Sequence, residues 1–172
     1  RRTVKPRCER AAELVARTGR PAVAWCHLNA EGDLLERLIP GAVQVGGDDS
    51  DERKEELFRA FETGEARVMV TKPTVAGYGL NWQHCAHQTF FPSHSFEQFY
   101  QAVRRCWRFG QRSPVTVDMV ASDGEAGVVD NLNRKAAAAD QMFDRLVGLM
   151  ADQLSVSRSG YGGRRMEVPS WM

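Results

Sequence analysis

Short apolar runs alternate with helix-forming stretches along most of this chain, and this alternation constrains the fold more than any other feature. The runs have the length of buried strands and are predicted at residues 22–28, 42–45, 67–71, 88–91 and 115–120. Helices are predicted around them at residues 7–18, 31–38, 51–63, 95–109 and 125–150. Strands that alternate with helices form parallel sheets covered by helices. The sequence therefore predicts an α/β fold.

The helix predicted at residues 95–109 carries its own boundary signals and an apolar side. Ser95 and Gln98 have the spacing of a capping box, which satisfies backbone amides at a helix start. Gly110 is expected to end the helix, because glycine readily adopts the left-handed conformation found after helices. The residues expected to face the core recur at helical spacing, namely Phe96, Phe99, Tyr100, Val103 and Trp107.

The opposite side of this helix holds Gln101, Arg105 and Arg108 at positions i, i+4 and i+7. Two guanidinium groups on one side can present cations to a phosphate. An ordinary solvated helix face has the same pattern, and spacing alone favours neither interpretation. Arg104 points toward the flank of the helix, where a surface ion pair is expected.

A glycine-containing loop is predicted upstream, after the apolar run at residues 67–71. Gly77 and Gly79 tolerate backbone conformations and close approaches that other residues resist. Ligands bind at the carboxyl ends of parallel strands, so a phosphate or ribose could approach this loop. By themselves, the two glycines favour a plain turn between strand and helix. Trp82, which follows the loop, is predicted to belong to the core, as is Trp107.

These two segments together resemble a known pair of motifs. Gly77-Tyr-Gly-Leu-Asn81 and, downstream, Gln-x-x-x-Arg-x-x-Arg-x-Gly-Gln at residues 101–111 resemble motifs V and VI of superfamily 2 helicases, in the form used by SWI/SNF-like DNA translocases. Residues 22–26 resemble the motif IV strand, and residues 46–61 resemble the stretch that follows it. The resemblance extends over residues 20–122, and residues 72–73 and 81–85 look most like the phage and prophage branch. It implies a RecA-like parallel sheet flanked by helices, the second lobe of a P-loop NTPase-type motor.

The resemblance implies a role for each motif residue. Arg105 and Arg108 correspond to arginine fingers, and Gln101 corresponds to a residue that orients the fingers or the nucleotide. Gly77, Gly79 and Asn81 correspond to nucleotide-binding positions, with Asn81 on the ribose. The family touches the nucleic-acid backbone through the loop that here contains Thr71, Lys72 and Thr74. Pro73 departs from the commoner SWI/SNF pattern, so the contacting residue among these three is left open.

The sequence lacks the motifs that hold the phosphates and the metal in such motors. It contains no Gly-x-x-x-x-Gly-Lys-Ser/Thr segment and no Asp-Glu motif at a strand end. We therefore expect ATP and Mg²⁺ to be bound mainly by a missing first lobe, and the isolated chain to be inactive as an ATP hydrolase. Residues 1–20 are expected to form a leading helix or linker from that lobe, residues 21–152 the helicase C-terminal lobe, and residues 153–172 a flexible tail.

Composition and charge exclude some classes and leave others open. The chain is 42% hydrophobic and 26% charged, with a net charge of +1, which is ordinary for a soluble globular domain. No apolar run is long enough to span a membrane. The cluster of His84, Cys85 and His87 supplies too few ligands for a metal site, so none is predicted, and the four cysteines are expected to be reduced thiols.

The resemblance implies a partner and a place in the cell. The partner is DNA, expected to be double-stranded, and the isolated lobe is expected to be a monomer in the cytoplasm of a bacterium or of a phage-infected host cell. Charge adds little to the DNA assignment, because no single stripe of Lys and Arg is present. Two alternatives stay open: a stand-alone nucleic-acid-binding or adaptor module with a helicase-lobe fold, and the motor lobe of an RNA helicase or restriction enzyme.

Overall fold

The computed structural model describes residues 3–76 and 80–160 of this 172-residue chain, without the side chains of residues 140, 143 and 146–160. The strands are β1 (Ala22–Trp25), β2 (Ala42–Val45), β3 (Val68–Thr71), β4 (His87–Phe90) and β5 (Thr116–Met119). The helices are α1 (Val4–Thr18), α2 (Asn29–Leu38), α3 (Asp51–Glu62), α4 (Phe96–Arg104), the 3₁₀ helix η1 (Asp123–Glu125) and α5 (Ala126–Gly160). No helix in the described ranges is long and apolar enough to cross a membrane.

The five strands form one parallel sheet in the order β2-β3-β1-β4-β5. Each predicted strand is present, and the predicted α/β class is confirmed. The central strand β1 pairs with β3 on one side and β4 on the other, so that Ala22 lies beside both Val68 and His87. Strands β2 and β5 form the two edges.

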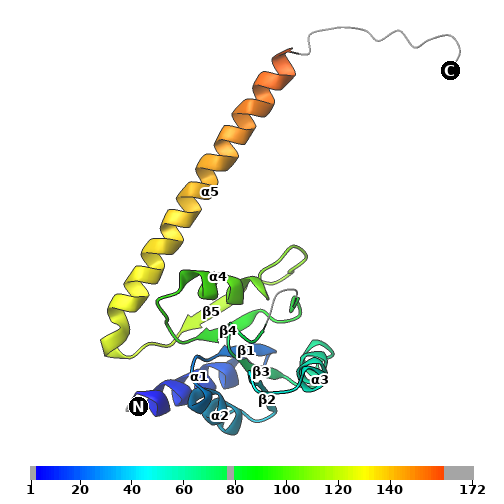
Figure 1. Cartoon of the computed structure of the whole chain (residues 1–172), viewed down its shortest axis with the longest axis vertical. Coiled ribbons are helices and arrows are strands. Elements are labelled where there is room, and N and C mark those ends of the chain that lie inside the picture. The colour runs from blue at the N-terminus through cyan, green and yellow to red at the C-terminus, as the bar shows by residue number, and fades with distance from the viewer. Residues whose placement is uncertain (1–2, 77–79, 161–172) are drawn as a thin grey trace, which may run out of the picture. The chain divides into compact units, whose positions relative to one another are not determined.

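Successive residues of β1 point to opposite faces of the sheet, as the strand period requires. Ala22 and Ala24 lie in a core cluster that includes the buried residues of α1 and α2. Val23 and Trp25 lie in a second cluster that includes buried residues of α3 and α4. Figure 1 shows α1 and α2 on one side of the strands and α4 on the other. Strands β1 and β3 are buried throughout, which explains why they appear as mostly apolar runs in the sequence. Strand β4 is equally buried, although its sequence is His-Gln-Thr-Phe.

Local signals set the ends of α3. The Ser50 hydroxyl accepts a hydrogen bond from the Arg53 amide at 3.3 Å. Asp51 and Glu52 occupy the first turn, where the helix dipole stabilises negatively charged side chains. Gly64 follows the helix with φ of 81°, a left-handed conformation that favours glycine. The prediction for this helix is confirmed to within one residue.

Helix α1 is built into the core. Its Cys8, Ala11 and Val15 are fully buried and pack in the same cluster as α2 and the sheet. The chain divides into two compact units, Arg1–Leu132 and Asn133–Met172, and α5 contributes residues to both. The predicted end of the last helix at residue 150 is wrong, since α5 continues through Gly160.

The prediction for α4 is wrong in its end and in part of its apolar side. The helix stops at Arg104, and Gly110 adopts its φ of 96° in a later turn. Tyr100 and Trp107 are 44% and 53% exposed, whereas Ala102 and Cys106 are buried. The helical spacing does not reach Trp107, because the chain leaves the helix before that residue.

Trp82 does lie in the core, as predicted. Its side chain is fully buried, and its ring centroid lies 5.3 Å from Phe61, 5.9 Å from Phe58 and 6.0 Å from Trp25. The residue therefore anchors the end of the glycine-containing loop against α3 and β1. Its indole N–H has no hydrogen-bond partner among the described residues.

Candidate functional site

The topology places a candidate site at the carboxyl edge of the sheet. Because β3 and β4 pair with opposite sides of β1, the segments that follow them leave the sheet at neighbouring carboxyl ends, where ligands bind in open α/β sheets. A pocket of about 300 Å³ lies between these two segments. It is lined by Pro73, Thr74, Ser95, Glu97, Gln98, Gln101 and Arg105.

Gln101 and Arg105 meet in this pocket. Gln101 lies in α4 and Arg105 follows that helix directly. Both line the pocket together with Thr74, which belongs to the segment after β3. Ser95 starts α4 as predicted, because its hydroxyl accepts a hydrogen bond from the Gln98 amide at 3.2 Å. Arg105 was expected on an exposed helix face, but it is only 9% exposed. A largely buried guanidinium in the wall of this pocket can pair with an anionic ligand.

A row of hydrogen bonds joins residues 80–85 to residues 105–111, and we call it the seam. The Trp82 amide donates to the Arg105 carbonyl at 2.8 Å. The Arg108 guanidinium donates to the Leu80 carbonyl at 3.3 Å. The backbone of Arg105 and the side chain of Arg108 are therefore held against the end of the first motif.

Two glutamines complete the seam. The Gln83 side-chain amide donates to the Phe109 carbonyl. The Gln111 side-chain amide donates to the carbonyls of Cys85 and Cys106, each at 3.1 Å. Gly110 lies close to Gln83, since a Cβ atom there would lie 3.2 Å from the Gln83 amide nitrogen. Sequence reasoning missed Gln83 entirely, and no local pattern indicates its partner.

The structure separates the two predicted arginine fingers by exposure. Arg108 is exposed, and its bond to Leu80 places it beside Asn81, which is also exposed. Arg105 instead lines the pocket with Gln101. Gly77 and Gly79, the other predicted nucleotide-binding positions, lie outside the described residues.

The three predicted nucleic-acid contacts differ in accessibility. Thr71 is fully buried, and its hydroxyl donates to the Val45 carbonyl at 3.0 Å, so its side chain serves the sheet. Lys72 is partly exposed, and its ammonium group donates to the Asn29 side chain. Thr74 is exposed at the pocket rim. Lys72 and Thr74 are thus the two whose side chains can reach a ligand.

A buried glutamine ties α4 to the sheet. Gln88 in β4 is fully buried, accepts from the Trp25 indole at 2.7 Å and donates to the Val103 carbonyl at 3.2 Å. A buried amide with partners for both its oxygen and its nitrogen fixes the neighbouring elements in one arrangement. No local sequence pattern indicates that Trp25 and Val103 are the partners of Gln88.

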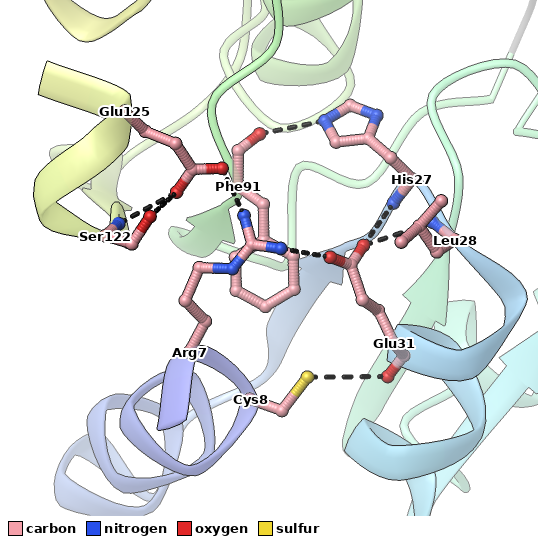
Figure 2. A network of polar contacts seen from close by, with 8 residues as sticks. All are labelled: Arg7, Cys8, His27, Leu28, Glu31, Phe91, Ser122 and Glu125. Carbon is pink, nitrogen blue, oxygen red and sulfur yellow. Dashed lines mark hydrogen bonds and ion pairs between the residues drawn. The ribbon is translucent and has the colours of Figure 1, made fainter. Parts of the chain in front are cut away.

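A second polar network lies near the carboxyl ends of β1 and β4 and centres on Arg7 (Figure 2). The guanidinium makes ion pairs of 2.6 Å with both Glu31 and Glu125, and it lies over the Phe91 ring at 5.0 Å from the centroid. The Arg7 side chain is 11% exposed and that of Glu31 is 2% exposed. The network joins α1, α2 and η1, which local sequence patterns cannot predict.

Both carboxylates of this network also accept backbone hydrogen bonds. Glu31 accepts from the amides of His27 and Leu28 at 3.0 and 3.1 Å. Glu125 accepts from the Ser122 amide and hydroxyl at 2.8 Å each. Burial raises the pKa of Glu125, but the bonds from Ser122 and the Arg7 charge outweigh burial, so its pKa lies below the ordinary value.

The cysteines are buried in the core, and His87 is paired with a carboxylate. All four cysteines are free and buried. Burial raises the pKa of Cys26 to about 12, so this thiol stays protonated and unreactive at neutral pH. The His87 ring lies 2.8 Å from the Asp118 carboxylate. Within residues 3–76 and 80–160, no group of three or more His, Cys, Asp and Glu side chains is placed to hold a metal ion.

Comparison with known sequences gives two weak relatives, and no protein-family model matches the chain. The bifunctional helicase and thymine dioxygenase JBP2 of Leishmania tarentolae is 30% identical over 112 residues, or 61% of this chain and 10% of the relative. JBP2 of Leishmania braziliensis is 29% identical over 120 residues, or 66% of this chain and 11% of the relative. The chain thus spans about a tenth of the length of these relatives.

Comparison with solved structures concerns the fold. The C-terminal part of the Fun30 ATPase domain superposes with a TM-score of 0.60 and 15% identity, over 69% of this chain and 40% of that one. The C-terminal domain of a Dbp5 variant from S. cerevisiae, bound to a Gle1 variant and IP6, superposes with a TM-score of 0.66 and 11% identity. The superposition covers 78% of this chain and 80% of that one. Dbp5 of S. cerevisiae bound to RNA and ADP BeF3 superposes with a TM-score of 0.65 and 15% identity, over 76% of this chain and 36% of that one. The chain therefore has the fold of a RecA-like lobe of the helicase type.

Proposed function

We propose that this chain is the second motor lobe of an ATP-dependent DNA helicase or translocase of the SWI/SNF-like, phage-related branch. The observation that carries the proposal is the seam, which holds the Arg108 guanidinium and the Arg105 backbone against the segment that contains Asn81. Motor lobes need cations fixed beside a nucleotide-binding loop. The pocket at the carboxyl edge, with Arg105 and Gln101 in its wall, supports the same assignment.

The substrate proposed for this site is ATP. Charge develops on the transferred phosphoryl group during hydrolysis, and a guanidinium that stays charged and donates parallel hydrogen bonds suits it. We assign Arg108 and Arg105 to this group, Gln101 to their orientation and Asn81 to the ribose. Mg²⁺ would be held mainly by a first lobe, because the chain carries no Walker A or Asp-Glu motif.

The nucleic acid is proposed to meet the segment after β3. Lys72 supplies a cation and Thr74 an exposed hydroxyl for backbone phosphates. Double-stranded DNA is the partner that the motif resemblance favours. RNA is the second candidate, because Dbp5, with a similar fold, has been solved bound to RNA and ADP BeF3.

The test is ATP hydrolysis by the protein that contains both lobes, measured with duplex DNA, with RNA and with neither. Stimulation by duplex DNA supports the proposed motor, and stimulation by RNA alone supports the second candidate. The isolated chain is expected to release no phosphate above background. Nucleic-acid binding without any hydrolysis in the two-lobe protein would contradict the motor and favour a binding or adaptor module.

A further inference from the structure

Helix α4 and the chain that follows it expose aromatic rings that a core would normally bury. Tyr100 is 44% exposed, Trp107 is 53% exposed and Phe109 is fully exposed. Isolated exposed apolar residues are common, but three exposed aromatic rings within ten positions are an unusual concentration of apolar surface on one short segment.

Two arginines accompany these rings, and neither is in an ion pair with a carboxylate that the structure describes. The Arg104 guanidinium lies over the Trp107 ring at 5.2 Å and over the Tyr100 ring at 5.9 Å from the centroids. Arg112 is exposed on the same segment. Neither arginine takes part in the ion pairs formed by residues 3–76 and 80–160. Tyr100, Arg104 and Trp107 contact one another, and Phe109 and Arg112 are exposed just after them in the sequence. We name these five residues the arginine–aromatic surface.

We infer that the arginine–aromatic surface binds single-stranded nucleic acid by stacking bases on its rings. Its uncompensated positive charge selects an anionic occupant, and its exposed rings offer faces to unpaired bases. Several rings and two cations suit consecutive nucleotides of a strand better than one mononucleotide. Duplex bases are already stacked and cannot use the rings. The surface extends the proposed function to a second nucleic-acid contact, and it requires neither ATP hydrolysis nor a first lobe.

The test is binding of a fluorescently labelled oligothymidine to the chain, followed by fluorescence anisotropy without nucleotide. We expect Trp107→Ala to weaken binding by about 5- to 150-fold, the range for loss of one stacked base. Trp107→Phe keeps an aromatic face and should stay close to wild type. Leu28→Ala is the matched control, because Leu28 is 52% exposed but lies outside this surface. Thermal melts should show that all three variants are folded.

Three results would overturn the inference. The first is unchanged binding by Trp107→Ala, and the second is equal affinity for a duplex of the same length. The third is complete displacement of oligothymidine by AMP at a concentration equal to that of the protein. Competition by polyglutamate with the affinity of oligothymidine would instead identify an acidic protein partner. None of these results depends on hydrolysis, so a failure here is distinct from a failure of the proposed motor function.

Discussion

The Arg108 guanidinium donates to the Leu80 carbonyl at 3.3 Å, and this contact places it one residue from Asn81. Two motifs that are separated along the chain therefore share one surface. The contact is exposed, so the Arg108 guanidinium contributes little to stability and is accessible to a ligand.

Arg108→Ala should leave the fold intact and remove about 10³-fold or more of the DNA-stimulated kcat in the two-lobe protein. Surface substitutions usually change the free energy of unfolding by less than about 0.5 kcal/mol, and the exposed Arg108 meets this condition. Single-turnover hydrolysis and a thermal melt measure the two effects. Arg59→Ala, an exposed arginine on α3, is the control for charge. An Arg108→Ala variant that melts and hydrolyses ATP like wild type would show that Arg108 is not a finger.

Asn81→Ala should raise the KM for ATP more than it lowers kcat. A ribose contact exists both before and during the reaction, so its loss removes uniform binding. Steady-state kinetics of the two-lobe protein over a range of ATP concentrations separate the two constants. A decrease in kcat at unchanged KM would place Asn81 elsewhere in the mechanism.

Arg7→Met should destabilise the fold by about 3–5 kcal/mol, because it leaves a buried carboxylate without its cation. Glu31, at 2% exposure, is that carboxylate. Urea unfolding measures the free energy. Lys5→Met is the matched control on the same helix, since Lys5 is 77% exposed in its pair with Glu9 and surface pairs contribute little. Equal midpoints for the two variants would mean that Arg7 does not hold the network together.

Glu125 should make stability sensitive to acid. Its folded-state pKa is lowered by Ser122 and Arg7 despite burial, so its stabilising contribution is present above pH 4.5 and is lost as pH falls through the folded-state pKa. Glu125→Gln lacks this titration. The stability gap between wild type and Glu125→Gln, measured by urea unfolding from pH 7 to pH 3, should therefore narrow below pH 4.5. A gap that stays constant over this range contradicts the assigned pKa.

The sequence by itself determined the elements and the motifs. All five strands could be predicted. For β1 and β3 the signal is a mostly apolar run, as expected of strands that are buried on both faces. The ends of α3 could be predicted as well, because Ser50 and Gly64 act on their immediate neighbours. The two motif segments could be identified because their residues are close together in the chain.

Tertiary contacts decided the rest. In a helix continued to residue 109, the carbonyl of Arg105 would accept the amide four residues on. It accepts instead from the Trp82 amide, so α4 ends at Arg104 and the rings beyond it reach the surface.

The Arg7 network shows the same limit of sequence reasoning. Arg7 pairs with Glu31 across 24 positions and with Glu125 across 118 positions. A periodic pattern reports only which side of its own element a residue occupies. The partners of Arg7, like those of the seam, are fixed only when the parallel sheet brings distant segments to one edge.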